Sequence, residues 1–172
     1  MSAQNAPAAV VVMGVSGSGK TTVGALLAGR IGARFVDADD LHPAQNKAKM
    51  HAGVPLTDED REPWLRLVGE AIRTERALGR SIVVACSALR RSYRDLIRNE
   101  AGDVSFMHLA GSRELLGQRL DARMGHFMPA ALLDSQLATL EPLGADEQGA
   151  VLDVAVTPEQ AVDAALAALA AA

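Results

Sequence analysis

Short apolar runs alternate with longer stretches of mixed polarity along this chain. The runs are rich in β-branched residues, which is typical of strands buried in a parallel sheet, and the stretches between them carry helix-capping signals and apolar stripes. This alternation predicts an α/β fold, a parallel sheet flanked by helices. Five strands are expected, over residues 8–13, 34–37, 81–86, 104–109 and 151–156. Helices are expected to start at residues 22 and 157 and to span residues 43–52, 57 to about 78, 90–100, 112–123 and 129–140.

Two helix starts are marked in the local sequence. Thr57 with Asp60 forms a capping-box pattern, and Thr157 followed by Pro158 combines an N-cap residue with a first-turn proline. No internal repeat and no long linker divides the chain, so residues 1–172 are expected to form a single domain.

Residues 14–21, with the sequence GVSGSGKT, match the P-loop pattern G-x-x-x-x-G-K-[ST] at every fixed position. The predicted strand before this segment and the predicted helix after it supply the context that the motif requires. Such a loop directs backbone N–H groups and the positive end of a helix toward one point, where phosphate binds. Lys20 is expected to reach the β- and γ-phosphates, as a catalytic residue, and the Thr21 hydroxyl is expected to bind Mg²⁺. The sequence therefore predicts a nucleoside triphosphate site built from Gly14, Val15, Ser16, Gly17, Ser18, Gly19, Lys20, Thr21 and Thr22.

Charge and cysteine content narrow the functional classes. The net charge is −4 and the basic residues form no block, which argues against nucleic acid or an anionic membrane as a partner. Cys86 is the single cysteine, so an internal disulfide is excluded. No Lys or Arg precedes Lys20, and the apolar stretches are too short to span a bilayer, so a cytoplasmic protein without a signal peptide is expected.

Acidic residues follow the second predicted strand, at the kind of sheet edge where open α/β folds bind ligands. Asp37 and Asp39 stand two residues apart there. Asp39 is the candidate for a carboxylate that orients or deprotonates an attacking hydroxyl, and Asp37 is the candidate for contact with Mg²⁺ through water. The alternative is that both, like Asp40, are solvated turn residues. The strand at 81–85 runs into Cys86 and not into a Walker-B aspartate, which counts against a motor or switch ATPase.

A second basic cluster lies at about residues 119–128. Arg119 and Arg123 are four residues apart on one helical face, and Gly125 supplies a hinge. In small phosphotransferases such a segment closes over the triphosphate and places arginines on the developing charge. We expect a small mobile lid here, with both arginines contacting nucleotide and Arg123 acting in catalysis. The alternative is a solvated basic helix end that complements the helix dipole.

Several further segments resemble the bacterial gluconokinase family. The resemblance covers roughly residues 10–156, and the segments LHP at 41–43 and DREPWL at 60–65 are more specific than the P-loop. The matching positions are residues 37–43, 46, 49–50, 53, 55–56, 58–65, 86–89, 93–96, 125–127 and 144–147.

This resemblance implies ATP-dependent phosphorylation of D-gluconate at its C6 hydroxyl, with Mg²⁺ as the metal cofactor. It also implies a three-layer P-loop kinase fold with a parallel five-stranded sheet, similar to shikimate and adenylate kinases, and usually a homodimer.

A gluconate site needs a cation for the carboxylate and several hydrogen-bonding groups for the hydroxyls. Arg61 is the first candidate for the carboxylate, because a guanidinium binds it bidentately. Lys49 and Arg90 stay open as alternatives, and Arg61 has the alternative of a local ion pair. The candidate substrate residues are Asp39, His42, Lys49, Arg61, Ser87, Arg90 and His126, of which either histidine has the alternative of simply packing in its loop.

Three other residues are expected to be structural: Trp64 as a packing anchor, His108 inside a strand, and Cys86 as a small core residue. Two other functions stay open at this stage. One is a different small-metabolite kinase of the same fold, such as shikimate kinase, and the other is a nucleotide-binding switch protein without metabolic turnover.

Overall fold

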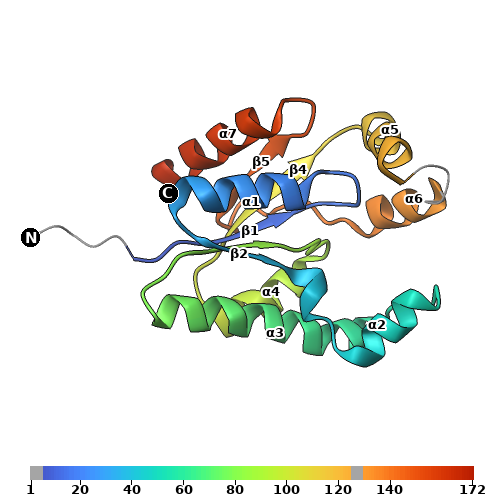
Figure 1. Cartoon of the computed structure of the whole chain (residues 1–172), viewed down its shortest axis with the longest axis horizontal. Helices are drawn as coiled ribbons and strands as arrows, with labels where there is room; N and C mark the ends of the chain where they lie inside the picture. The colour runs from blue at the N-terminus through green and yellow to red at the C-terminus, as the bar shows by residue number, and fades with distance from the viewer. Residues whose placement is uncertain (1–5, 125–129) are drawn as a thin grey trace, which may run out of the picture.

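A five-stranded parallel sheet forms the centre of the molecule (Figure 1). The computed structural model describes residues 6–124 and 130–172, and for residues 123, 124 and 130 it describes the backbone alone. The strands follow the order β2-β3-β1-β4-β5, and every neighbouring pair is parallel. Their bounds are β1 Ala9–Met13, β2 Arg34–Asp37, β3 Ile82–Ala85, β4 Ser105–Ala110 and β5 Gly149–Asp153.

Helices cover both faces of this sheet and make the three layers that the sequence predicts. Helices α1 and α7 lie on one face and α3 and α4 on the other, while α2 and the pair α5–α6 lie near the carboxyl ends of the strands (Figure 1). The bounds are α1 Lys20–Ile31, α2 Ala44–His51, α3 Asp58–Ala77, α4 Arg91–Ala101, α5 Arg113–Met124, α6 Ala130–Thr139 and α7 Pro158–Ala171, with a short 3₁₀ helix, η1, at Ala38–Leu41.

The central strand β1 separates two hydrophobic cores. Val10 and Val12 pack with α1 and α7, whereas Val11 and Met13 pack with α3 and α4, because successive side chains of a strand point to opposite faces. All four side chains are fully buried. Burial of side chains of this size stabilises the fold by about 1.5–3 kcal/mol each, so β1 is a rigid base for the loop that follows it.

The capping signals in the sequence are used as predicted. Thr57 forms a capping box with Asp60 at the start of α3, and Thr157 forms one with Gln160 at the start of α7. The Ser112 hydroxyl accepts a hydrogen bond from the Leu115 backbone N–H at 3.2 Å and caps α5. These contacts explain why the predicted starts of these helices match the structure closely.

The bounds of the last strand were predicted wrongly. The sequence predicts residues 151–156, but β5 begins at Gly149, which pairs with Phe106 of β4, and ends at Asp153. Gly149 has φ 143°, and a Cβ there would lie 1.8 Å from the Phe106 carbonyl oxygen, so only glycine allows this close start. Val154 is buried after the strand has ended, which is why its apolar character misled the prediction.

Across residues 6–124 and 130–172, no helix has the length and apolar character needed to cross a membrane.

Candidate active site

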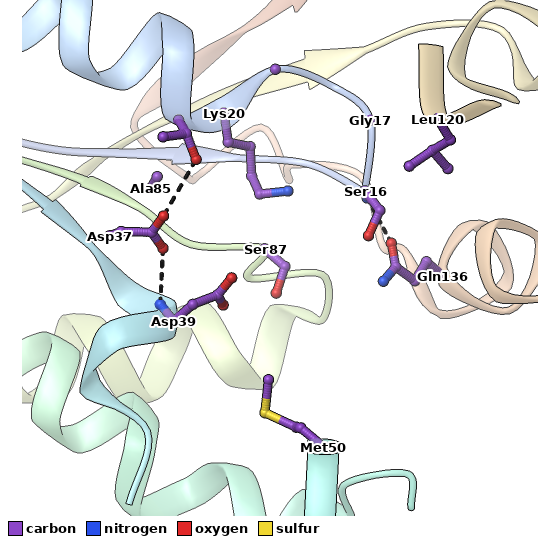
Figure 2. A pocket seen from close by; sticks show the side chains of 12 residues that line it. Ser16, Gly17, Lys20, Asp37, Asp39, Met50, Ala85, Ser87, Leu120 and Gln136 are labelled. Atoms are coloured by element: carbon purple, nitrogen blue, oxygen red, sulfur yellow. Dashed lines mark hydrogen bonds between the residues drawn. The ribbon is translucent and has the colours of Figure 1, made fainter. Parts of the chain in front are cut away.

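A pocket of about 430 Å³ opens at the carboxyl ends of β1, β2 and β3 (Figure 2). The P-loop forms one wall, and the segment that leaves β2 forms the opposite wall. Its lining residues are Ser16, Gly17, Gly19, Lys20, Thr21, Asp37, Asp39, Met50, Ala85, Ser87, Leu120 and Gln136.

The P-loop joins β1 to α1, as its sequence predicts. Gly17 has φ 83°, and a Cβ there would lie 2.8 Å from the Leu120 side chain, so the loop needs glycine both for its backbone conformation and for close packing against α5. The Ser18 hydroxyl donates to the Val15 carbonyl at 2.7 Å and closes the loop from within. The loop is therefore shaped before any ligand arrives.

Lys20 is the first residue of α1, and its side chain extends into the pocket (Figure 2). Its Nζ donates to the Val15 carbonyl at 3.1 Å. This contact places the ammonium group inside the curve of the loop, where the phosphates of a nucleotide are expected to lie.

Thr21 and Asp37 bring two oxygen donors together across the pocket. The Thr21 hydroxyl lies 3.4 Å from the Asp37 Oδ2 atom, and Asp37 Oδ1 accepts a hydrogen bond from the Asp39 backbone N–H at 3.0 Å. Among the described residues no cluster of three or more His, Cys, Asp or Glu side chains forms a metal site. A hydroxyl and a carboxylate fit Mg²⁺ of the kind that kinases use, because that ion takes few protein ligands and shares the phosphates of its substrate.

Asp39 faces the same pocket from η1 (Figure 2). Burial removes water from around the Asp39 carboxyl group and raises its pKa above the ordinary value of 3.8, and the negative charge of Asp37 raises this pKa further. The positive charge of Lys20 opposes this shift. Asp39 is thus a pocket carboxyl group with an increased affinity for a proton, and such perturbed groups mark candidate functional sites.

Ser87 lines the pocket from the turn that follows β3. The backbone N–H of Gly14, the first P-loop residue, donates to the Ser87 carbonyl at 3.3 Å. This bond ties the turn to the P-loop. The structure therefore brings together Ser87, Asp39 and Lys20, three of the residues that the sequence singled out.

The other predicted substrate residues lie beside the pocket and are not part of its lining. Lys49 forms a salt bridge to both carboxylate oxygens of Asp60, at 3.0 and 2.8 Å. Arg61 donates to the Leu56 carbonyl at 2.8 Å and lies 3.7 Å from Asp58. Arg90 lies 4.0 Å from the same Asp58 carboxylate. His126 lies outside the described residues.

His42 packs in the way that its structural alternative predicts. Its ring is buried and stacks on Trp64 with 4.1 Å between ring centroids, and its Nδ1 lies 3.2 Å from Asn46 Nδ2. Burial lowers the pKa of His42, and the nearby charges of Arg61 and Lys47 lower it further. Trp64 is a packing anchor, as predicted, because its indole N–H donates to the Ala38 carbonyl at 2.7 Å and so holds the helix that carries Asp39.

A smaller pocket of about 100 Å³ lies behind the P-loop. Gly19, Thr22 and Arg119, which the sequence predicts to bind nucleotide, contribute to its lining. The rest of the lining is mostly apolar and consists of Ser18, Val23, Leu109, Asp153, Val154, Val156, Pro158 and Ala161. The side chain of Arg123 lies outside the described residues.

Sequence reasoning missed Gln136, Met50 and Leu120. Gln136 of α6 accepts a hydrogen bond from the Ser16 backbone N–H at 2.7 Å, which ties α6 to the P-loop. Gln136 is distant from the P-loop in the sequence and belongs to no motif, so nothing local marks it. Leu120 lies in the predicted lid segment, but sequence reasoning assigned a role there to the arginines alone. Met50 directly follows Lys49 and sits in a segment of family resemblance, which is the only signal that points to it.

Comparison with known proteins adds to this geometry. A family model described as an AAA domain matches residues 10–143. The chain is 52% identical to a gluconokinase of Gluconobacter oxydans over 141 residues, which cover 82% of this chain and 79% of that protein. It is 44% identical to a thermosensitive gluconokinase of Escherichia coli over 162 residues, 91% of this chain and 87% of that protein.

Two solved structures are also similar to this chain. A gluconokinase from Sinorhizobium meliloti superposes with a TM-score of 0.86 at 47% identity, covering 96% of this chain and 93% of that one. A shikimate kinase from Aquifex aeolicus superposes with a TM-score of 0.60 at 14% identity, covering 94% of this chain and 96% of that one. At that identity the shikimate kinase shares the fold alone.

Proposed function

The chain belongs to the gluconokinase family, and we propose that it transfers the γ-phosphoryl group of ATP to the C6 hydroxyl of D-gluconate. The products are 6-phospho-D-gluconate and ADP. The single observation that carries this function is the pocket in which Lys20 and Thr21 of the P-loop face Asp37 and Asp39, in a chain 52% identical to a gluconokinase. An assay of gluconate-dependent ADP release tests it.

The P-loop holds the triphosphate in this reaction. Its backbone N–H groups and the start of α1 surround the β- and γ-phosphates, and Lys20 adds a mobile positive charge. The smaller pocket takes the nucleoside, since its apolar wall offers a base a surface to pack on and Arg119 offers it a planar cation.

Asp39 accepts the proton of the C6 hydroxyl as the oxygen–phosphorus bond forms. The hydroxyl oxygen attacks the γ-phosphorus, the bond from phosphorus to the β,γ-bridging oxygen breaks, and ADP leaves with that bond's electrons. A carboxyl group whose pKa is raised holds the proton better than an ordinary aspartate, so the environment of Asp39 suits this role. Ser87 faces the same space and is a hydrogen-bonding group for the sugar acid.

Arg61 remains our proposal for the gluconate carboxylate. Lys49 is held by both oxygens of Asp60, whereas Arg61 and Arg90 share the exposed carboxylate of Asp58. An incoming carboxylate competes with this solvated ion pair, which contributes little at such distances. The bond from Arg61 Nη1 to the Leu56 carbonyl at 2.8 Å holds the guanidinium from its other side. Of the two histidines, His126 stays in the proposed set, whereas the ring of His42 is buried and stacks on Trp64.

Mg²⁺, when bound, neutralises charge on the phosphates, and Thr21 and Asp37 are the residues that would hold it. The change Asp37→Asn removes one negative charge from this pair but keeps the shape of the side chain. We expect the variant to need a higher Mg²⁺ concentration for half-maximal activity, with a smaller loss at saturating Mg²⁺. Titration of activity with Mg²⁺ measures this, and an unchanged Mg²⁺ requirement would contradict the assignment.

We propose that residues 119–124, at the end of α5, close over the bound nucleotide as part of the lid expected at about residues 119–128. Arg119 gains its nucleotide partner only when nucleotide is present, and such a differential contact is what allows a ligand to shift a conformational equilibrium. Hydrogen exchange at residues 119–124 is expected to slow on addition of a non-hydrolysable ATP analogue with Mg²⁺, while exchange in β1 stays unchanged. Equal protection of residues 119–124 with and without the analogue would rule the lid out.

We further propose that the enzyme is a homodimer, as the family resemblance implies, and that it is cytoplasmic, as the single cysteine and the N-terminal sequence lead us to expect. Light scattering is expected to give twice the chain mass of 18.0 kDa. A mass equal to that of one chain across the micromolar range would contradict the dimer.

A further inference from the structure

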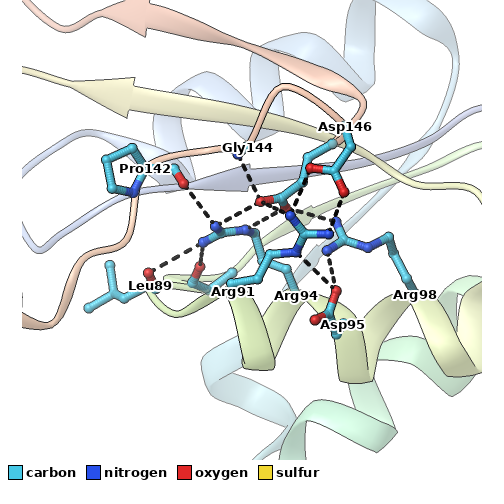
Figure 3. Close-up of polar contacts among 10 residues, drawn as sticks. Leu89, Arg91, Arg94, Asp95, Arg98, Pro142, Gly144 and Asp146 are labelled. Carbon is cyan, nitrogen blue, oxygen red and sulfur yellow. Dashed lines mark hydrogen bonds and ion pairs between the residues drawn. The ribbon is translucent and has the colours of Figure 1, made fainter.

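A fully buried arginine, Arg94 of α4, lies at the centre of a polar network away from the pocket (Figure 3). Its Nε and Nη2 atoms donate to the two carboxylate oxygens of Glu147 at 2.7 and 3.0 Å. Its Nη1 donates to the carbonyls of Ala88 at 2.9 Å and Leu89 at 3.3 Å, and Nη2 also donates to the Pro142 carbonyl at 3.3 Å. These bonds use all five N–H groups that a guanidinium offers.

Glu147 is the counter-charge that keeps this guanidinium in place. Its side chain is also fully buried, and it accepts further bonds from the Gly144 backbone N–H at 3.0 Å and from Arg98 at 2.9 Å. Burial alone would raise the pKa of Glu147, but the bonds from Arg94, Gly144 and Arg98 outweigh it and lower the pKa to about 2. The pair is therefore ionised throughout the physiological pH range.

Two of the three backbone carbonyls that Arg94 binds, those of Ala88 and Leu89, belong to the turn that carries Ser87. Ala88 has φ 45°, and within the described part of the chain it is the one non-glycine residue with a positive φ. Such a conformation costs energy and persists only where the surroundings enforce it. The bonds from Arg94 to Ala88 and Leu89 supply that restraint directly beside Ser87.

The same network reaches the segment that leaves α6. The Leu89 carbonyl also accepts a hydrogen bond from the Glu141 backbone N–H at 2.7 Å, and Arg94 itself holds Pro142. Helix α6 in turn carries Gln136, which contacts the P-loop at Ser16. Arg94 therefore joins the acceptor side of the pocket, through Ser87, to the helix that touches its phosphate side.

A buried ion pair is a poor device for stability alone. Desolvation of the two charges offsets most of their attraction, and apolar side chains of similar size often replace such a pair without loss. Apolar side chains cannot, however, hold three backbone carbonyls at fixed positions. The specific contribution of Arg94 is thus the position of the turn.

We propose that Arg94, held by Glu147, is a positioning residue that fixes the turn of residues 86–89 so that Ser87 faces the phosphoryl acceptor. The mechanistic part of this inference rests on the proposed function, because it takes gluconate as the acceptor. The restraint on the turn itself does not depend on the identity of the substrate.

The test replaces the ion pair with apolar side chains, in the double variant Arg94→Met/Glu147→Met. The matched control is Arg91→Met, because Arg91 lies on the same helix, binds Asp146 at 2.9 and 2.8 Å and approaches Glu147 only to 3.5 Å, but makes no bond to Ala88 or Leu89. We expect the double variant to lower kcat/KM for gluconate by about 10–100-fold, since small misplacements in a site cost this much. Its affinity for ATP, measured by calorimetry, should stay within about threefold of the wild type, and the control should keep both values.

A double-mutant cycle with Ser87→Ala distinguishes positioning from a general loss of structure. If Arg94 acts through Ser87, the loss in kcat/KM when Ser87→Ala is added to the double variant should be at least about threefold smaller than the product of the losses that the two changes cause separately. Independent losses that multiply, or equal weakening of gluconate and ATP binding, would overturn the proposal. Should the apolar pair prevent folding, Arg94→Lys serves instead, because it keeps the charge but cannot span Glu147 and the carbonyls together.

Hydrogen exchange separates this inference from the proposed function. The amides of residues 86–89 are expected to exchange at least about tenfold faster in the double variant or in Arg94→Lys than in Arg91→Met. This result requires no substrate, so it stands even if gluconate proves to be the wrong acceptor. Unchanged protection of residues 86–89 in a folded variant would overturn the positioning role by itself.

Discussion

Lys20→Ala is expected to lower the turnover of gluconate phosphorylation by about 10³-fold or more. The ammonium group lies inside the P-loop curve, 3.1 Å from the Val15 carbonyl, where it is proposed to contact the transferring phosphoryl group. Removal of a single electrostatic contact to a transition state commonly costs about 10²–10³-fold, and a full positive charge on a phosphoryl group costs more. Steady-state assays at saturating ATP and gluconate measure the loss.

The fold should survive this change, because Lys20 is half-buried and belongs to neither hydrophobic core. A thermal unfolding curve close to that of the wild type is the check on this point. Lys47→Ala is the matched control, since Lys47 is exposed and makes only a 3.4 Å contact to the Asp40 carbonyl. Near-normal activity in folded Lys20→Ala protein would mean that this loop does not hold the transferring phosphate.

Asp39→Asn is expected to remove about 10²–10⁴-fold of the transfer rate, the range of a general-base step. Asparagine keeps the shape of the side chain and loses its ability to take the hydroxyl proton. Binding of Mg²⁺ and ATP should be largely retained, because Asp37 and Thr21 are the residues proposed to hold the metal. Asp40→Asn is the neighbouring control, and a comparable loss of transfer in that variant would contradict the specific role of Asp39.

The raised pKa of Asp39 gives this variant a second signature, in stability. A group whose pKa is higher in the folded state than in the unfolded state favours folding only at low pH, and that contribution is lost as the pH rises through the folded-state pKa. At neutral pH the ionised Asp39 therefore opposes folding, so Asp39→Asn should unfold at the same temperature as the wild type or higher. For the same reason, the acid limb of the pH profile of kcat/KM should lie above the ordinary aspartate pKa of 3.8.

The features that could be predicted from the sequence depend on neighbouring residues. Strand β1, the P-loop and the start of α1 form one continuous segment, so the apolar run and the glycine spacing were enough to place Lys20 and Thr21. Cys86 and His108 are buried, as their positions in apolar strands predicted. Burial raises the pKa of the Cys86 thiol to about 12, which agrees with a core residue that has no role as a thiolate.

The features that the sequence did not reveal depend on contacts between distant segments. Arg94 and Glu147 are separated by 53 positions and meet only because α4 and the loop before β5 pack together in the folded chain. Gln136 meets Ser16 across 120 positions. The salt bridge of Lys49 with Asp60 joins α2 to α3, so it depends on how these helices pack and could not be predicted from the sequence. The contact of Arg61 with Asp58 is local to α3 and is the ion pair that the sequence offered as an alternative role for Arg61.

The central claim is tested most directly by ADP release from ATP and Mg²⁺ in the presence of single candidate acceptors, with D-gluconate, other sugar acids and shikimate compared side by side. The account predicts rapid ADP release with D-gluconate and a phosphate ester at C6 of the product, as identified by nuclear magnetic resonance. It also predicts little release with shikimate or with no acceptor. Release that is unaffected by D-gluconate, or that is faster with shikimate, would contradict it.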